Sequence, residues 1–174
     1  MAGTPTTPTT TTPTTTTPTT TTPTTATPTT AGLEQLKALI NKGAEEGYGI
    51  GALLGMAAEE LEPGRVVFSL APRTDFSNPL GTVHGGVLST LLDSAMGCAV
   101  HTSLAEGAGY TTLELKVNFV RAVPLEGGRL TCEGTTVHVG RKIATAEGRI
   151  VDQDGRLVAH GTTTCMIFPP ATDQ

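Results

Sequence analysis

The longest apolar pattern in the chain runs from Val87 to Val100 and has the period of an α-helix. Its apolar residues come in adjacent pairs spaced four apart: Val87, Leu88, Leu91, Leu92, Ala95, Met96, Ala99 and Val100. A stripe this wide is typical of a helix that is covered on most of its sides. The pattern therefore predicts a long central helix, which the chain reaches through a Pro- and Gly-rich loop at 71–83.

Other segments alternate apolar and polar residues with the period of a β-strand. The clearest spans 111–120, where Leu113, Leu115, Val117 and Phe119 share one face. Shorter patterns of the same kind predict strands at 50–58, 66–70, 130–139, 143–151 and 156–168. Turn-forming residues separate the strands at 59–64, 124–128, 140–142 and 152–155. We expect a bend or bulge near Gly134, where the parity of the apolar positions changes.

Ahead of the first strand, apolar residues at helical spacing predict a short amphipathic helix from Leu33 to Lys42 that ends at Gly43. The predicted order is helix, two strands, long helix and four strands. Short hairpins make consecutive strands neighbours in space. The sequence therefore predicts an α+β domain in which a curved antiparallel sheet wraps the long central helix.

The N-terminal segment 1–32 differs in composition from the rest. Thr and Pro fill most of it, a proline recurs at every fifth position from Pro8 to Pro28, and no side chain is charged. Regular proline prevents a helix and interrupts a strand ladder, and few apolar groups are available to offset the entropy of ordering. We expect a disordered Thr/Pro-rich tail at 1–32 and a single domain at 33–174.

Composition narrows the class of partner and the compartment. The formal net charge of −5 argues against a general nucleic-acid binder, which would carry a basic face. No apolar run is long enough to span a membrane, and the N-terminus lacks the features of a secretory signal. Cys98, Cys132 and Cys165 lie far apart within apolar patterns, as core residues in a reducing compartment do. We expect a cytoplasmic protein with neither a nucleic-acid nor a membrane partner.

One carboxylate stands out on the predicted central helix. At about 100° per residue, Asp93 lies opposite the apolar stripe, on a face otherwise formed by Gly86, Thr90 and Gly97. A solvent-facing aspartate is the ordinary alternative, but such a face would be expected to carry Lys, Glu or Gln. Small residues instead let a ligand or another backbone approach closely. Asp93 is therefore a candidate catalytic group.

The two glycines at the start of this helix are a second candidate feature. The N–H groups of Gly85 and Gly86 have no partner within the helix and could stabilise a developing oxyanion, although a simple loop-to-helix turn also explains them. Asp93 lies eight residues after Gly85, which is roughly 12 Å along the axis. A reacting carbonyl must lie about 3 Å from both groups, so one subunit cannot supply both. If both act on one atom, a homodimer with two composite sites is required.

These residues resemble a known family. The run 78–86, Asn-Pro-Leu-Gly-Thr-Val-His-Gly-Gly, followed by Asp93, is similar to the hotdog-fold acyl-CoA thioesterases of the PaaI type. Segments 112–119, 140–144 and 155–162 extend the resemblance over residues 45–168. It implies a long helix wrapped by an antiparallel sheet, in dimers that join edge to edge and often pair into tetramers. It also implies hydrolysis of acyl-CoA, with aryl or phenylacetyl-type acyl groups favoured.

The resemblance implies roles for five residues. Asp93 matches the carboxylate that acts as nucleophile or general base, and Gly85 matches the oxyanion donor across the dimer interface. Asn78 matches the residue that places the attacking water or the carbonyl. His84 matches one that hydrogen-bonds near the thioester or orients the loop, and Thr112 matches a hydroxyl that some members use to hold water.

Further ligand contacts and other functions stay open. Arg141 and Lys142, on a predicted turn, could bind the phosphates of coenzyme A, and a solvated turn explains them almost as well. Thioesters react readily once their carbonyl is polarised, so we expect neither a metal nor an organic cofactor. One branch of the family has Glu in place of Asp93 and a hydroxyl one turn later, where this chain has Gly97. The alternatives are an acyl-thioester dehydratase or hydratase of the same fold, and a non-catalytic acyl-CoA-binding module.

Overall fold

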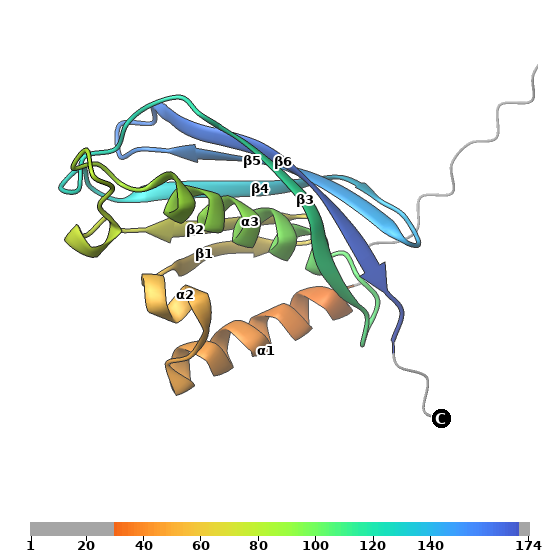
Figure 1. Ribbon diagram of the computed structural model, residues 1–174. Helices are drawn as coiled ribbons and strands as arrows, with labels where there is room; N and C mark the ends of the chain where they lie inside the picture. Colours follow the sequence, from red (N-terminus) through yellow and green to blue (C-terminus); the bar gives the residue numbers. More distant parts are fainter. Residues whose placement is uncertain (1–29, 171–174) are drawn as a thin grey trace, which may run out of the picture.

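The structure, a computed structural model, describes residues 30–170. Six antiparallel strands form one curved sheet around helix α3, Gly85–His101 (Figure 1). The strands are β1 Ala57–Glu62, β2 Arg65–Leu70, β3 Gly109–Phe119, β4 Leu130–Val139, β5 Ile143–Val151 and β6 Leu157–Phe168. The remaining helices are α1 Ala31–Glu46, α2 Gly49–Leu54 and the 3-10 helix η1 Thr74–Phe76. The predicted α+β architecture, a long helix wrapped by an antiparallel sheet, is confirmed.

The strand order across the sheet is β1-β2-β4-β5-β6-β3. The chain leaves α3 and forms β3, which pairs with β6, the last strand of the domain. β1 and β3 are therefore the two edges of the sheet. β3 is the longer edge, at 11 residues, and runs back along α3 from its C-terminal end to its N-terminal end (Figure 1). Within residues 30–170, the outer edge of β3 has no strand partner.

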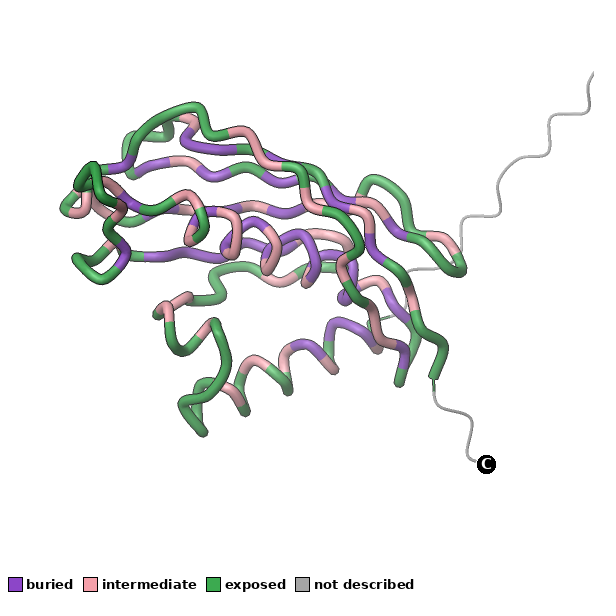
Figure 2. The backbone as a smooth tube through the Cα atoms, in the orientation of Figure 1, coloured by how far each residue is buried: buried purple, intermediate pink, exposed green. Residues whose placement is uncertain are grey.

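The core lies between α3 and the inner face of the sheet, where the buried segments of Figure 2 face one another. Leu91, Leu92 and Met96 of α3 are fully buried, as are Leu130 of β4 and Ile150 of β5. The apolar stripe read from the sequence is the stripe that packs on the sheet. Removal of this apolar surface from water is the main force that holds the helix in place.

Gly134 and Gly148, two members of a row of three glycines, set how closely α3 approaches the sheet. Gly134, Gly148 and Gly161 pair side by side in one row across β4, β5 and β6. A Cβ on Gly134 would lie 2.5 Å from the carbonyl oxygen of Ala95, and a Cβ on Gly148 would lie 2.8 Å from Cγ of Met96. Only glycine leaves room for the helix backbone at this distance. The row therefore positions the helix that carries the candidate carboxylate.

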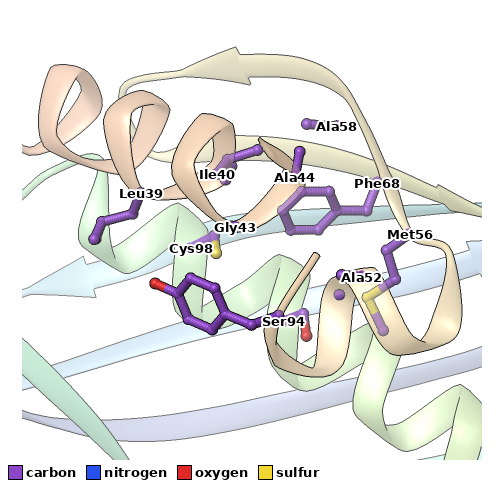
Figure 3. Close-up of a pocket in the computed structure, with 12 residues that line it drawn as sticks. Leu39, Ile40, Gly43, Ala44, Ala52, Met56, Ala58, Phe68, Ser94 and Cys98 are labelled. Atoms are coloured by element: carbon purple, nitrogen blue, oxygen red, sulfur yellow. The ribbon is translucent and has the colours of Figure 1, made fainter. Parts of the chain in front are cut away.

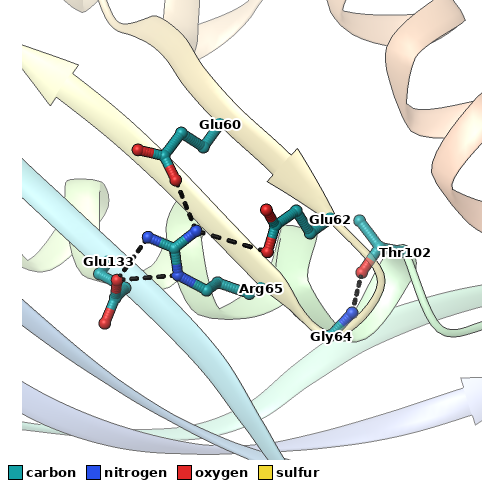
Figure 4. A network of polar contacts seen from close by, with 6 residues as sticks. All are labelled: Glu60, Glu62, Gly64, Arg65, Thr102 and Glu133. Carbon is teal, nitrogen blue, oxygen red and sulfur yellow. Dashed lines mark hydrogen bonds and ion pairs between the residues drawn. The ribbon is translucent and has the colours of Figure 1, made fainter.

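Polar contacts tie the β1–β2 hairpin to its neighbours (Figure 4). On the outer face of the sheet, Arg65 Nη1 lies 2.6 Å from Glu60 and its Nη2 lies 2.8 Å from Glu133 of β4. Hydrogen bonds to these two carboxylates raise the pKa of Arg65. At the hairpin tip, Gly64 N donates to Thr102 Oγ1 at 2.8 Å, just beyond the end of α3. The hairpin is thereby joined both to the sheet and to the central helix.

The predicted end of the first helix is wrong. α1 continues through Gly43 to Glu46 and ends at Gly47. Gly47 has φ 65°, a left-handed conformation that favours glycine, and its N–H bonds to the carbonyl of Gly43. The predicted tail at 1–32 falls almost entirely on residues 1–29, which lie outside the described residues. No helix within residues 30–170 is both long and apolar enough to cross a membrane.

The predicted strand at 50–58 is wrong over its first seven residues, which form α2 and the residues after it. The predicted turn at 59–64 is also too long, because residues 59–62 belong to β1. The turn at Pro63-Gly64 pairs Glu62 with Arg65. The ladder ends at the pair of Ala57 and Ser69, one residue before the end of β2 at Leu70. Residues before Ala57 have no strand to pair with, and a strand without a ladder is not stable.

Bulges also fall where the apolar pattern did not place them. In β4 the irregularity lies at Val137, between Thr136 and His138, and not at Gly134. In β3 a bulge at Leu113 turns that side chain outward, so that it is 53% exposed. The single apolar face predicted for this strand is therefore interrupted. The other predicted strands and turns agree with the structure to within one or two residues at their ends.

Candidate active site

Asp93 is held by a residue of the edge strand. It lies half-buried on α3, and Thr112 Oγ1 of β3 donates a hydrogen bond to its Oδ1 at 2.8 Å. The two residues are 19 positions apart in the sequence and meet because β3 runs back along the helix. The structure thus joins two of the predicted site residues in one contact. The bond fixes one carboxylate oxygen, and Oδ1 and Oδ2 are no longer equivalent.

The helix face around Asp93 is only partly bare. Gly97 is buried, because the ring of Tyr110 packs where a side chain at 97 would stand, with its Cε2 2.8 Å from the position of a Cβ. The open face expected from the helical wheel is therefore closed at this end by the chain's own β3. Burial, with the negative charge of Asp93, raises the pKa of the neighbouring Cys98 thiol to about 12, and a hydrogen bond with Tyr110 partly opposes this.

His84 caps the start of α3. Its Nδ1 accepts a hydrogen bond from the N–H of Gly86 at 2.9 Å. This contact is a standard way to satisfy a free donor at a helix N-terminus. The N–H of Gly86 is therefore engaged within the chain. Gly85 differs, since its N–H forms no hydrogen bond with any of the described residues.

Asn78 organises the loop that leads to the helix. Its Oδ1 accepts from the N–H groups of Leu80 at 2.9 Å and Thr82 at 3.1 Å, and its Nδ2 donates to Thr82 Oγ1 at 2.8 Å. Two backbone bonds hold the end of the loop, from Val83 N to Val123 O and from His84 N to Phe76 O. These contacts fix the position of the helix N-terminus.

Asn78 and Gly85 share a hollow that does not include Asp93. This cavity of about 340 Å³ is also lined by Phe119 and Arg121. The Phe119 ring lies 3.0 Å from where a Cβ on Gly85 would stand. Phe119 ends β3, whereas Thr112 lies near its start. The predicted site residues therefore form two groups at opposite ends of one edge strand, as the spacing of Gly85 and Asp93 required.

Arg141 and Lys142 lie apart from both groups. They form the exposed turn between β4 and β5, where the Lys142 carbonyl accepts a bond from Ile167 N. Ala144, Cys165 and Thr112 lie in one row across β5, β6 and β3. The turn projects only a few residues beyond the row that holds Thr112.

An apolar cavity, which the sequence did not reveal, lies on another side of α3. It measures about 290 Å³, is open to solvent, and is lined by residues of α1, α2, β1, β2 and α3 (Figure 3). Its walls include Ile40, Ala44, Met56, Phe68, Ser94 and Cys98. Ser94 directly follows Asp93, and Cys98 is the thiol whose pKa is raised by burial and by the Asp93 charge. Among the described residues, no three His, Cys, Asp or Glu side chains are grouped as a metal site would require.

Sequence comparison places the chain among known proteins. The thioesterase superfamily model matches residues 80–159. A protein of Saccharolobus solfataricus named as an esterase is 32% identical over 99 residues, which are 57% of this chain and 69% of that protein. The medium/long-chain acyl-CoA thioesterase YigI of Escherichia coli K12 is 26% identical over 129 residues, or 66% of this chain and 82% of that protein.

Structural comparison agrees with the sequence. A thioesterase family protein from Silicibacter pomeroyi is 30% identical with a TM-score of 0.68, over 76% of this chain and 98% of that chain. The chain belongs to the thioesterase superfamily. The PaaI protein of E. coli, from the phenylacetic acid degradation operon, is 20% identical with a TM-score of 0.68, over 79% of this chain and 97% of that chain. The predicted hotdog fold and the resemblance to PaaI-type thioesterases are both confirmed.

Proposed function

We propose that the protein hydrolyses acyl-CoA thioesters, with Asp93 of one subunit and Gly85 of a second subunit acting on the same carbonyl. The observation that carries the proposal is the placement of both groups along β3. Thr112 holds Asp93 near the start of this strand, and Phe119 packs on Gly85 at its end. Membership of the superfamily and similarity to YigI, a named acyl-CoA thioesterase, support the reaction.

A dimer joined through β3 would bring the two groups together. β3 is a sheet edge with unpaired backbone groups, and such edges favour pairing with another chain. Antiparallel pairing about a two-fold axis at Lys116, with Leu113 as the extra residue of the bulge, would set Thr112 opposite Phe119 of the second copy. Leu113, Phe119 and the nearby Val120 are each more than half exposed, and the dimer would cover them. Two such dimers would pair further into a tetramer.

The chemistry needs only the groups at these two ends. In one route, an Asp93 oxygen attacks the carbonyl carbon, the C–S bond breaks, and the resulting acyl-aspartyl anhydride is hydrolysed by water. In the other, Asp93 accepts a proton from a water molecule whose oxygen attacks the carbonyl. In both routes the thiolate of coenzyme A leaves and takes up a proton. The free N–H of Gly85 would stabilise the oxyanion that forms.

The remaining predicted residues take supporting roles in this proposal. Asn78 and His84 hold the loop and the helix start, and so place the Gly85 donor. Asn78 also faces the shared hollow, where its amide could orient the carbonyl or a water. Gly86 gives its N–H to His84 and shapes the turn. Arg141 and Lys142 would meet the phosphates of coenzyme A as it extends past β6.

The first test measures release of free thiol from a panel of acyl-CoA substrates. Asp93→Asn should lose most of its activity, whereas the matched control Asp75→Asn, an exposed aspartate in η1, should keep it. Unchanged hydrolysis by Asp93→Asn would remove this residue from the mechanism. A single turnover in ¹⁸O-labelled water identifies the anhydride route if the label enters Asp93, because water that attacks the aspartyl carbonyl of the anhydride leaves its oxygen there, whereas the general-base route puts the label only into the acid product.

The second test concerns Gly85. Proline is well tolerated at the first position of a helix, and His84 has the extended φ −63° and ψ 134° that suit the residue before a proline. Gly85→Pro therefore removes the N–H with little change in fold, and we expect kcat to fall by about 10²–10³. Gly85→Ala adds the same Cβ beside Phe119 and retains the N–H, so it separates the donor from the contact.

Mixed dimers test the composite site directly. Random pairing of Asp93→Asn with Gly85→Pro subunits makes about half the dimers mixed, each with one intact site, so about a quarter of wild-type activity should return. If each site lay within one chain, every site in the mixture would carry a defect. Absence of any recovery in a mixture shown to exchange subunits would rule out the composite site.

A further inference from the structure

The apolar cavity beside α3 has a composition that narrows the chemistry of its occupant. No charged side chain lines it, and its polar side-chain groups are the hydroxyls of Tyr48 and Ser94 and the thiol of Cys98. Burial and the nearby Asp93 charge keep that thiol neutral, since its pKa is raised to about 12. An acyl group that carries a carboxylate would lose hydration here without gaining a partner. The cavity suits an uncharged hydrocarbon.

The position of the cavity links it to the carboxylate. Ser94 and Cys98 form its wall on α3. Ser94 directly follows Asp93 and Cys98 lies about one turn beyond Ser94, so the cavity wall and the carboxylate are neighbours on the same helix. A thioester whose carbonyl lies at Asp93 could therefore place its acyl chain in this cavity.

The opposite walls come from a part of the chain outside the superfamily match. α1 and α2 supply Ile40, Ala44 and Ala52, and these helices precede residues 80–159. In Figure 3 these side chains face Phe68, Cys98 and Ser94 across the cavity. α2 buries none of its residues, and of α1 only Gly32, Leu33 and Leu36 are buried. Apart from those three residues, neither helix has a buried residue. The two helices therefore form a cover over the cavity.

The cavity measures about 290 Å³ and is open to solvent, because Leu39, Ala44, Tyr48 and Ala52 of its lining are exposed. Its walls combine the small side chains of Ala44 and Ala52, the thioether of Met56, and the rings of Tyr48 and Phe68. These largely apolar surfaces favour a hydrocarbon group.

We propose that this cavity binds an uncharged hydrocarbon acyl group, and that the α1–α2 cover sets the longest chain the protein accepts. The proposal rests on the proposed thioesterase function for the identity of the substrate.

The test uses thioether analogues, alkyl-CoA of two to twelve carbons, which bind without being hydrolysed. For the wild-type protein, affinity measured by calorimetry should rise about fourfold per carbon and level off once the chain outgrows the cavity. Ala44→Phe, which fills the cavity from α1, should lower the affinity for octyl-CoA at least about tenfold and leave ethyl-CoA within about twofold. Ala52→Leu should shorten the limit from the α2 side.

Ala38→Phe is the matched control, because Ala38 is an exposed alanine of the same helix and does not line the cavity. Equal losses in Ala38→Phe and Ala44→Phe, or an affinity that does not depend on chain length in the wild-type protein, would overturn the proposal. Thioesters of the same chain lengths separate the cavity proposal from the proposed hydrolysis. Length-dependent binding without thiol release keeps the cavity and rejects hydrolysis, whereas hydrolysis with an unchanged length profile in Ala44→Phe rejects the cavity alone.

Discussion

Gly134→Ala should be among the most damaging single-methyl changes in this protein. Gly134 sits in the middle of the sheet, between Val66 of β2 and Gly148 of β5. An added Cβ would lie 2.5 Å from the oxygen of Ala95 and 2.6 Å from the nitrogen of Met96, both backbone atoms of α3. Ordinary contact begins at 3.4 Å, so helix and strand would have to separate by about 0.9 Å.

Neither side can yield cheaply, because both are backbone in the most buried part of the domain. Overpacking of this kind costs typically 1–3 kcal/mol, and we expect the upper end, about 3 kcal/mol. For a domain of this size the melting temperature should fall by about 10 °C. A shift of α3 also moves Asp93 relative to Thr112, so activity should drop at least about tenfold even where the protein is folded.

The assay is thermal unfolding at one fixed protein concentration, with thiol release measured well below the transition. Gly109→Ala is the control, because Gly109 also lies in a strand and a Cβ there meets nothing within 4 Å. It should change stability by no more than about 0.5 kcal/mol. A melting temperature for Gly134→Ala within about 2 °C of wild type would be too small a shift for this clash. The close approach of helix and sheet would then not be what requires glycine at 134.

Two further predictions concern single contacts. Thr112→Val removes the hydrogen-bond donor to Asp93 and should lower kcat about tenfold or more with little change in stability. Thr112→Ser retains the hydroxyl and should keep kcat near the wild-type value. Equal losses in both variants would mean that the hydroxyl does not position the carboxylate. Burial lowers the pKa of His101 below 6.5, and the Nε2 of this residue has no partner among the described residues. The folded state therefore favours the neutral imidazole. The contribution of His101 to the free energy of unfolding is complete above pH 6.5 and is lost as the pH falls through the lowered pKa. Unfolding midpoints between pH 7.5 and 5 should drop more steeply for wild type than for His101→Phe, which keeps a ring against Tyr110; parallel curves would exclude His101 as the cause.

The sequence alone determined the central helix and the positions of the candidate catalytic groups on it. Eight apolar residues between Val87 and Val100 can be covered together only in a helix, so the period identifies the element without knowledge of its partners. The position of Asp93 on that helix and its offset from Gly85 follow from the fixed rise per residue. These are local properties of the backbone. For the same reason the division of the site into two distant groups could be deduced before the structure.

Other features depended on the pairing of strands. The alternation of Ile50, Ala52 and Leu54 fits either a strand or a helix. Residues 50–56 form no strand because the ladder between β1 and β2 reaches only to the pair of Ala57 and Ser69. The bulge at Leu113 and the role of Gly134 also arise from contacts with elements distant in sequence. The spacing of apolar residues is a property of one segment, whereas the hydrogen-bond ladder of a strand also depends on its partner strand.

Only the tertiary structure decided what surrounds Asp93. The motif drew attention to Gly97 as an open position, but β3 returns along α3 and fills that space with Tyr110. The same path gives Asp93 its partner Thr112, and the fold of α1 and α2 creates a cavity that no motif marks. The physical reason is common to all three. A helical repeat fixes which face a residue occupies, but the packing of distant segments determines what covers that face.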